Sequence, residues 1–284
     1  RAGFAMNRRL PTKNGYQNSP NPDGPVDHDV PVLRIERPDG KLRAVVFGYA
    51  CHNTTLGLYQ FCGDYAGFAQ QYLEQAHPGT TALFMIGCGG DQNPYPRSTL
   101  ELAEQHGRTL ATAVEAALLP KPRPLDGLLG MALAEVPLDF AAVPTREELL
   151  QAQQKKDPYE KGHASRLLDE LKKNGRLPTS YPYPVQVIRF GDDLVLVALG
   201  GEVVIDYALR LKRELAGPAV WVAGYSNDVF AYIPSARVLQ EGGYEATGAV
   251  LYSSLPSPFA PTLEDKIVGK VLELARKTQA KGKP

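Results

Sequence analysis

Two short apolar segments, each followed at once by a polar, glycine-rich loop, constrain the fold of this chain more than any other feature. LRAVVFGYA at 42–50 leads into GYACHNTT at 48–55, and TTALFMIGC at 80–88 leads into GCGGDQNPYPR at 87–97. Apolar runs of this length, bounded by turn-forming residues, are typical of buried strands. Ligands usually bind where such strands end in an α/β domain. We therefore expect a ligand site where these two loops meet.

The flanking segments predict a mixed α/β unit. VPVLRIE at 30–36 precedes 42–50 across the turn RPDGK, whose Pro-Asp-Gly order favours a hairpin, so we expect adjacent antiparallel strands. Apolar residues recur at helical spacing over 64–77 and 100–119, and a proline follows each segment. These patterns predict a helix after each of the two loops.

The second half of the chain continues the alternation of strands and helices. The expected elements are a strand near 127–139, a charged helical insertion at 145–178 broken at Asp157-Pro158, a hairpin over 184–202, a helix over 202–215, a strand over 218–224 and a helix over 262–277. Residues 1–29, rich in Asn, Pro, Gly and Asp, predict an irregular surface segment. With no internal repeat or domain-sized linker, residues 1–284 are expected to form one α/β domain of mixed sheets flanked by helices.

Charge and hydropathy exclude several partner classes. Lys+Arg 31 against Asp+Glu 31 gives zero formal net charge, so nucleic acid is not an expected partner. The longest apolar window, 194–201, is far short of the about 18 residues that a membrane span needs. The sequence starts at Arg1 without the features of a secretory signal, so we expect a processed or truncated start, and location cannot be predicted from this end.

Three cysteines lie in the stretch that contains the two loops. Cys51, Cys62 and Cys88 form an odd set without a CxxC pair, which argues against a cysteine-based zinc site. Buried free thiols are the favoured interpretation. A Cys51–Cys62 disulfide and a metal-binding or nucleophilic cysteine remain alternatives.

One histidine is a candidate metal ligand. His52 follows a strand, Glu202 precedes a helix and Tyr232 lies in a loop, so all three could converge on one sheet edge as an N/O zinc site. No HExxH or HxH motif is present, and a structural role for His52 is the alternative. The remaining histidines are expected outside the site: His28 in a turn or at the surface, and His77, His106 and His163 in solvent.

The loop GCGGDQNPYPR is neither a P-loop nor a GxGxxG motif, which disfavours nucleotide binding. The N–H groups of Gly89 and Gly90 could hold an oxyanion, and a tight structural turn is an equal alternative. No GxSxG motif is present to indicate a serine hydrolase.

Several motifs, taken in order, are similar to those of one known family. They are NRR at 7–9, GYACHNTT at 48–55, GDYAGFAQ at 63–70, GGDQNP at 89–94, GGE at 200–202 and YSNDVFAYIPS followed by EGGYEA. Together they resemble the neutral/alkaline non-lysosomal ceramidase family over roughly residues 1–255. Members are zinc-dependent amidases that cleave the N-acyl bond of ceramide and are mostly secreted or membrane-associated. The resemblance implies a ceramidase-like catalytic domain and an exported protein of lipid metabolism.

The resemblance also implies roles for individual residues. His52, Glu202 and Tyr232 match zinc ligands of the family. Tyr244 matches a second active-site tyrosine, at the family's separation (244 − 232 = 12). Arg8 matches an arginine near the scissile carbonyl, where its guanidinium would suit an oxyanion or a substrate carboxylate.

Two departures from the family pattern affect the expected chemistry. A further zinc histidine of the family lies upstream of the NRR motif, so the resemblance implies a ligand from outside this segment and an association with a missing N-terminal part. In GGDQNP, Asn93 stands where the family has serine. Because an amide cannot be acylated, we expect a zinc-activated water as the nucleophile, with Asp91 orienting it or taking its proton.

These features predict a zinc-dependent hydrolase of a linear amide or ester, with one Zn²⁺ per chain and a small-molecule or lipid amide as substrate. The sequence shows no membrane-inserting amphipathic stretch, so a polar substrate fits as well as ceramide. Two alternatives remain open: a non-catalytic ligand- or carbohydrate-binding protein on the same fold, and a subunit of a heteromer completed by the missing N-terminal segment.

Overall fold

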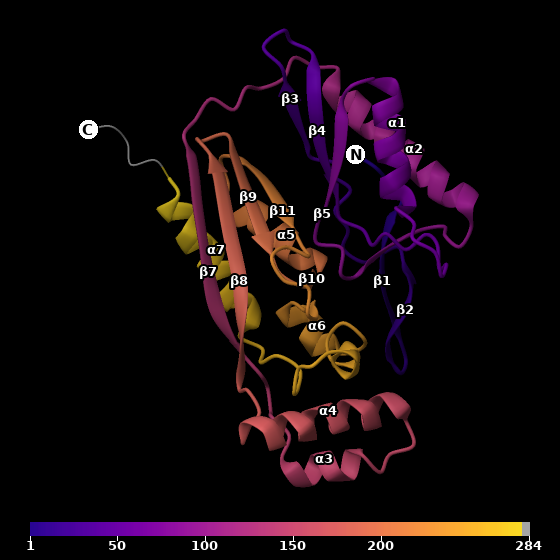
Figure 1. Cartoon of the computed structure of the whole chain (residues 1–284), viewed down its shortest axis with the longest axis vertical. Coiled ribbons are helices and arrows are strands. Elements are labelled where there is room, and N and C mark those ends of the chain that lie inside the picture. Colours follow the sequence, from indigo (N-terminus) through magenta and orange to yellow (C-terminus); the bar gives the residue numbers. More distant parts are fainter. Residues whose placement is uncertain (280–284) are drawn as a thin grey trace.

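The computed structural model describes residues 1–279, and its first layer is a three-stranded sheet (Figure 1). The central strand β4 (Leu42–Tyr49) pairs antiparallel with β3 (Val32–Glu36) and parallel with β5 (Thr81–Ile86). Helices α1 (Asp64–Ala76) and α2 (Leu100–Leu118) pack together over one face of this sheet. The buried side chains between sheet and helices include Val45, Phe47, Tyr49, Leu73, Leu110 and Val114. The hairpin, strand and helices predicted between residues 30 and 119 are confirmed.

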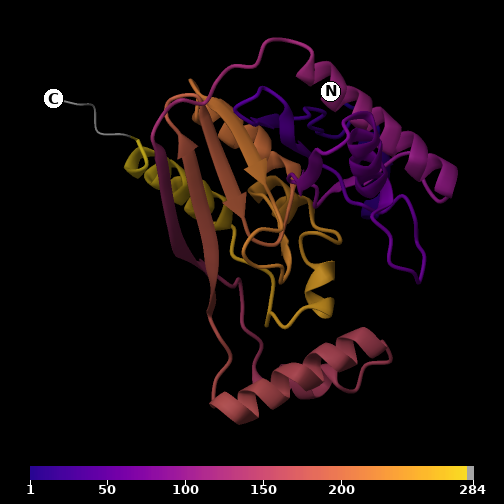
Figure 2. The ribbon, with the colours of Figure 1, turned by 45° about the horizontal axis from the view of Figure 1, so that its top comes forward.

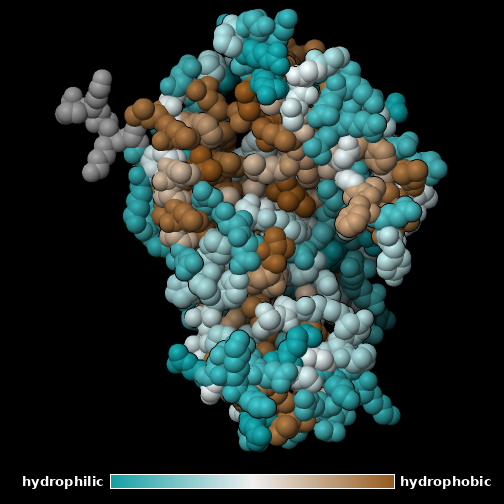
Figure 3. All heavy atoms as spheres, in the orientation of Figure 1, coloured by the Kyte–Doolittle hydropathy of each residue, from teal (hydrophilic) through white to brown (hydrophobic). Residues whose placement is uncertain are grey.

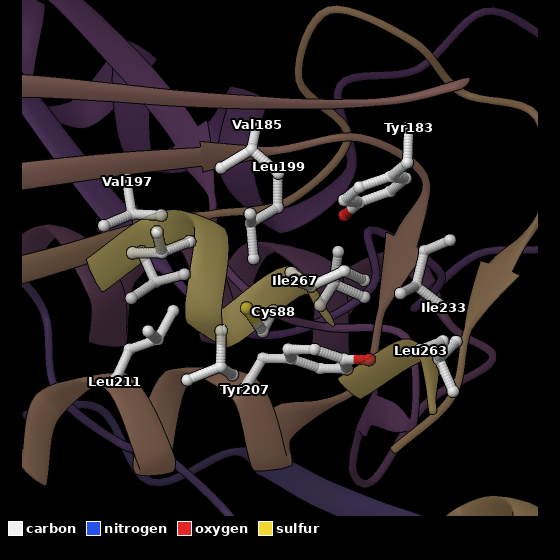
Figure 4. Packing of buried hydrophobic residues seen from close by; sticks show 14 of the residues in the cluster. Cys88, Tyr183, Val185, Val197, Leu199, Tyr207, Leu211, Ile233, Leu263 and Ile267 are labelled. Atoms are coloured by element: carbon white, nitrogen blue, oxygen red, sulfur yellow. The ribbon is translucent and has the colours of Figure 1, made fainter. Parts of the chain in front are cut away.

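A four-stranded sheet forms the second layer. Its order is β11-β9-β8-β7, with β7 (Leu129–Asp139), β8 (Ser180–Phe190) and β9 (Leu194–Leu199) antiparallel and β11 (Ala219–Ala223) parallel to β9. Helices α5 and α7 cover one face, and Figure 4 shows their side chains meeting those of the strands. The helices span Ile205–Glu214 and Leu263–Lys277. The hairpin, helices and strands predicted for this half are confirmed.

The two sheets meet at the carboxyl ends of their parallel strands. Gly87, just after β5, forms an antiparallel bridge with Ala223 at the end of β11. The N–H of Gly224 donates to the carbonyl of Ile86 at 3.2 Å. The loops that follow β4, β5, β9 and β11 therefore emerge close together, which is the arrangement expected of a ligand site at strand ends.

Short elements complete this junction. β10 (Glu202–Val203) follows β9 after two glycines and pairs parallel with β12 (Tyr232–Ile233). Helix α6 (Ala236–Glu241) and a short 3₁₀ helix (Gly248–Tyr252) come next in the chain. The segments containing Glu202 and Tyr232 are thus joined by backbone hydrogen bonds.

The N-terminal segment is more ordered than its composition indicates. β1 (Ala5–Thr12) pairs antiparallel with both β2 (Gly15–Asn21) and β6 (Gln92–Pro94), so the prediction of an irregular segment over residues 1–29 was wrong. The physical reason is that Arg8 and Arg9 are buried, where distant glutamates neutralise them. The polar composition of this segment therefore predicted solvent exposure, although β1 is the central strand of its sheet.

The charged segment between β7 and β8 forms two helices. α3 (Arg146–Ala152) begins with a Thr145 capping box, and α4 (Pro158–Asn174) begins after Asp157, whose side chain accepts from two backbone N–H groups. Figure 2 shows both helices projecting from the end of the long β7–β8 hairpin. They share a small core of their own, made of Leu149, Ala164, Leu167 and Leu177. α4 also packs against the segment that contains Tyr252, through the rings of Tyr159 and Tyr252 and the contact of His163 with the Leu255 carbonyl.

One face of the four-stranded sheet presents apolar side chains to solvent. On β7, Leu129, Met131 and Leu133 are each more than 60 % exposed, while the alternate residues face α7. Figure 3 shows hydrophobic side chains gathered over this side of the molecule. Within residues 1–279, no helix has both the length and the apolar character to cross a bilayer.

Candidate active site

His52 is fixed by the loop after β4. Its backbone N–H donates to the carbonyl of Gln92 at 3.0 Å, and its ring Nδ1 lies 2.9 Å from the same oxygen. A carbonyl oxygen only accepts hydrogen bonds, so Nδ1 bears a proton. The ring is almost completely buried, and its Nε2 points towards Glu202. This carbonyl-imidazole pairing is the outer-shell contact that orients metal-binding histidines.

Glu202 faces His52 from β10, the short strand that follows β9 of the four-stranded sheet. Its Oε2 lies 2.8 Å from Nε2 of His52. The backbone N–H of Glu202 donates to the carbonyl of Ala231, and Gly201, with φ of 69°, makes the turn that precedes it. Burial raises the pKa of Glu202, but its contacts with His52 and Tyr232 outweigh burial and lower the pKa overall. The side chain is therefore a carboxylate at neutral pH.

Two acceptors meet at this contact. If His52 carries its single proton on Nδ1, then Nε2 is a lone pair facing a carboxylate oxygen at 2.8 Å. Two acceptors at that distance need a cation between them, either a second proton on the ring or a metal ion. The contact between His52 and Glu202 therefore indicates a site that holds a positive charge, either a proton or a metal ion.

Two tyrosines complete the cluster. The Tyr225 hydroxyl lies 3.0 Å from Nε2 of His52 and 3.2 Å from Oε2 of Glu202, and the Tyr232 hydroxyl lies 3.5 Å from the same Nε2. Burial, with the Glu202 charge added, raises the pKa of Tyr225 well above its ordinary range. Burial also raises the pKa of Tyr232, although the charge of Arg8 opposes it. Four atoms that can bind a metal therefore lie close together: Nε2 of His52, Oε2 of Glu202 and the two tyrosine hydroxyl oxygens.

Arg8 borders this cluster on the β1 side. Its Nη2 donates to the Tyr232 hydroxyl at 3.0 Å and its Nε to Glu245 at 2.7 Å. Its guanidinium also lies over the rings of Tyr232 and Tyr244, at 5.4 and 5.7 Å from their centroids. Burial lowers the pKa of Arg8, but Tyr232 and Glu245 outweigh burial and raise it. Arg8 therefore stays charged.

Glu245 ties two buried arginines together. Its carboxylate accepts from Arg8 Nε at 2.7 Å and from Arg9 Nη1 at 2.6 Å, and all three residues are at most 6 % exposed. Arg9 is also paired with Glu241 and donates to the carbonyl of Gly242. The network connects β1 to α6 and holds Arg8 beside the cluster.

The glycine-rich loop has a packing function. The N–H groups of Gly89 and Gly90 donate to the carbonyls of Gly87 and Val203 at 2.8 and 2.9 Å. Both are engaged, so the oxyanion-hole interpretation is wrong and the structural turn is confirmed. A Cβ at Gly90 would lie 2.5 Å from the backbone oxygen of Glu202. Gly90 therefore allows the loop to approach the strand that contains Glu202.

Asp91 does not face the cluster. It is fully buried, and its carboxylate accepts from the side chains of Asn7 and Gln92 and from the N–H of Ile205, at 2.9 to 3.0 Å. Burial raises its pKa, with the contacts from Gln92 and Ile205 opposing the rise. The expected water-orienting role does not match this placement, because the donors occupy both oxygens. Asp91 anchors the first turn of α5 instead.

Asn93 does lie next to the cluster. Its Oδ1 is 3.4 Å from Nη1 of Arg8, and its Nδ2 is 3.5 Å from Oδ1 of Asn18. Both contacts are at the long limit for a hydrogen bond. The structure thus brings together His52, Glu202, Tyr232, Tyr244, Arg8 and Asn93, and leaves Asp91 and the glycines as supports.

Two histidines expected in solvent are buried. His106 stacks on Phe4 and contacts the carbonyl of Pro96, and His163 contacts the carbonyl of Leu255. Each lies on a helix face that packs against another segment, which includes Phe4 for His106 and Leu255 for His163, and helical spacing does not reveal such contacts. His28 contacts the Ala5 carbonyl from the segment before β3, and His77 is a half-exposed partner of Glu115.

The cysteines are not part of the cluster. All three are free, with Cys51 and Cys88 buried and Cys62 exposed, so the disulfide alternative is wrong and Cys62 is not the buried thiol expected. Burial raises the pKa of the Cys51 and Cys88 thiols, which makes them poor nucleophiles.

Sequence reasoning missed three members of the site. Tyr225, Glu245 and Arg9 lie inside the motifs YSNDVF, EGGYEA and NRR, but no role was assigned to them. Glu245 and Arg9 are charged residues among apolar neighbours. If such residues are buried they must form ion pairs, and this could have pointed to them. No local pattern distinguished Tyr225 from the other tyrosines.

Comparison with solved structures identifies the fold as that of ceramidases, as the sequence motifs predicted. The neutral ceramidase from Pseudomonas aeruginosa superposes with a TM-score of 0.67 and 17 % identity, over 99 % of this chain and 52 % of the ceramidase chain. A ceramidase complexed with C2 superposes with a TM-score of 0.62 and 17 % identity, over 99 % and 54 %. Neither protein-family models nor curated sequences match the chain. It spans about half the length of these ceramidases.

Proposed function

We propose that this chain is a zinc-dependent hydrolase of amide bonds. The observation that supports the proposal most strongly is the contact between Nε2 of His52 and Oε2 of Glu202 at 2.8 Å, with the other ring nitrogen already facing a carbonyl. Zinc accepts both atom types as ligands and removes the conflict between two acceptors. The ceramidase fold supports the same assignment, because ceramidases hydrolyse an N-acyl bond.

The donor set fits zinc. His52, Glu202 and Tyr232 would hold the ion, with Tyr225 close enough to His52 and Glu202 to orient them. Within residues 1–279, no group of three or more His, Cys, Asp or Glu side chains is arranged to hold a metal. The proposed set therefore relies on the tyrosine oxygen and on the further histidine that the family resemblance implies. When bound, zinc supplies a Lewis acid and a water of lowered pKa.

The chain's own residues supply the remaining functions. Arg8, charged and fixed by Glu245, lies next to Tyr232 and would stabilise negative charge on the carbonyl oxygen as water adds to the carbon. Tyr244, partly exposed and in edge contact with Tyr232, would bind the substrate at the open side. The C–N bond then breaks, the amine leaves with a proton, and the acyl part becomes a carboxylic acid.

The similarity to ceramidases supports a proposal for the substrate class. We propose a small-molecule or lipid amide with a linear acyl group. Export of the protein is proposed from the family resemblance of the motifs alone. Asn93 has no nucleophilic atom, so attack by this side chain on the amide and formation of an acyl-enzyme are not expected.

The alternative is a ligand-binding protein without catalysis. A doubly protonated His52 would form an ion pair with Glu202 and close the cluster without a metal. The two candidates differ in zinc content and in hydrolytic activity, and zinc content is the simpler of the two to measure.

Metal analysis of the purified chain tests the proposal. After incubation with zinc and removal of the excess, we expect about one zinc per chain, lost in His52→Ala and reduced in Glu202→Gln. His77→Ala is the matched control, since His77 also contacts a glutamate at 2.8 Å but lies elsewhere, and it should retain zinc. Absence of zinc from the wild type, or equal zinc in His52→Ala, contradicts the proposal.

A further inference from the structure

A small cavity adjoins the candidate active site on the far side of Arg8. Its volume is ≈ 80 Å³, and it lies between β1, β2 and the loop after β6. Arg8, Asn18, Ser19, Asn93, Tyr95 and Arg97 supply its polar lining. The guanidinium of Arg8 thus has one edge at Tyr232 and another at this cavity. A water takes about 30 Å³ of liquid volume, so a cavity of ≈ 80 Å³ suits a small group such as a carboxylate.

Arg8 is incompletely hydrogen-bonded on the cavity side. Its Nε and Nη2 make contacts of 2.7 and 3.0 Å with Glu245 and Tyr232, but Nη1 has only the 3.4 Å contact with Asn93. The residue is 6 % exposed. A guanidinium nitrogen whose one contact lies at the long limit for a hydrogen bond can donate to a further acceptor in the cavity. A ligand group placed at this nitrogen is therefore a hydrogen-bond acceptor.

The charge of the cavity specifies the acceptor further. Arg97 also lines it and, in the part of the chain that the structure describes, forms no ion pair. No aspartate or glutamate is among the lining residues. Glu245 and Glu241 neutralise Arg8 and Arg9, so the excess positive charge at the cavity is that of Arg97. A planar two-oxygen anion matches arginine donors best.

We propose that this cavity is a carboxylate subsite and that the preferred substrate is an amide with a carboxylate next to the scissile bond, as in an N-acyl amino acid. The proposal rests on the hydrolase function proposed above. Because one guanidinium borders both places, a carboxylate on Nη1 puts the neighbouring amide at Tyr232 and the metal-binding cluster. Neutral amides leave the cavity donors unpaired and bind more weakly.

Calorimetric titration of the whole chain tests the subsite without relying on catalysis. The probes are N-acetylglycine and N-acetylglycinamide, which differ only in the terminal group, an anionic carboxylate in the first and a neutral carboxamide in the second. We expect N-acetylglycine to bind at least about tenfold more tightly, and Arg97→Gln to reduce this ratio to below about threefold. Arg97→Lys keeps the charge and should restore part of the ratio. Arg43→Gln, at an exposed arginine of β4 outside the cavity, is the control and should leave the ratio unchanged.

Hydrolysis of a matched pair of longer N-acyl substrates gives a second readout. The ratio of kcat/KM for the acyl glycine over the acyl glycinamide should exceed about ten and fall in Arg97→Gln. Equal binding of the two probes by the wild type, or an unchanged ratio in Arg97→Gln, overturns the subsite. Selective binding of N-acetylglycine without hydrolysis of either substrate overturns the proposed hydrolase function and leaves the subsite supported.

Discussion

Nε2 of His52 and Oε2 of Glu202 lie 2.8 Å apart, although 150 residues separate them along the chain. One follows a strand of the three-stranded sheet, and the other follows a strand of the four-stranded sheet. Their contact therefore depends on how closely the two sheets approach at their carboxyl ends. Gly90, between them, sets that approach.

Replacing Gly90 by alanine should separate these two residues. The new Cβ would lie 2.5 Å from the backbone oxygen of Glu202, and the atoms in its way are backbone that cannot rotate aside. We expect a loss of about 1–3 kcal/mol in the free energy of unfolding, together with weaker zinc binding. Urea denaturation and metal titration measure both. Gly57→Ala, where no atom lies within 4 Å of the added Cβ, should change neither quantity. A fully stable Gly90→Ala variant would contradict the packing argument.

Removing the hydroxyl of Tyr225 should weaken the metal site without disturbing the fold. This hydroxyl contacts both His52 and Glu202, and losing an orienting partner typically lowers metal affinity about tenfold or more. A competitive zinc titration of Tyr225→Phe measures the change. Tyr159→Phe, at an exposed tyrosine of α4, is the control. Identical zinc affinity in both variants would show that the Tyr225 hydroxyl does not orient the metal ligands.

Glu245 should be the most important single residue for stability of the network. Glu245→Ala leaves Arg8 and Arg9 as buried charges that lack their shared partner, and breaking a buried pair costs about 3 kcal/mol or more in the free energy of unfolding. Glu214→Ala removes a surface partner of Arg210 and should cost below about 1 kcal/mol. Chemical denaturation separates the two. Equal, small losses would mean that the arginines find other acceptors.

His163 should make the stability of the chain depend on pH. Burial lowers its pKa from 6.5, and the hydrogen bond to Leu255 only partly opposes this. A folded-state pKa below the unfolded value contributes stability that is present above pH 6.5 and is lost as pH falls through the folded pKa. Glutamine can donate to the same carbonyl without titrating, so the stability advantage of the wild type over His163→Gln should shrink from pH 8 to pH 5. A constant difference in unfolding free energy across this range would contradict the assignment.

Most of the fold follows from local patterns in the sequence. The apolar runs at 42–50 and 80–88 and the helical periodicity after them defined the first layer, and the turn residues of RPDGK fixed the β3–β4 hairpin. His52, Glu202 and Tyr232 were identified by their positions after strands and by family resemblance. The structure brings the three together.

The remaining features depend on contacts between distant segments. Arg8 and Arg9 are polar in sequence but internal in the fold, because Glu245 neutralises them from more than 230 residues away. Asp91 is a residue type that can act as a catalytic base, but its carboxylate accepts a hydrogen bond from the N–H of Ile205 in the first turn of α5. Burial of this kind is set by tertiary packing, which periodicity and spacing do not encode.

The rate of N-acyl amide hydrolysis as a function of bound zinc tests the central claim most directly. The purified chain is stripped of metal, titrated with zinc, and assayed at each step with an N-acyl substrate. We predict that the rate rises in proportion to bound zinc up to about one ion per chain and that Glu202→Gln abolishes the rise. A rate that is independent of zinc, or no hydrolysis by the chain with zinc fully bound, would contradict the account.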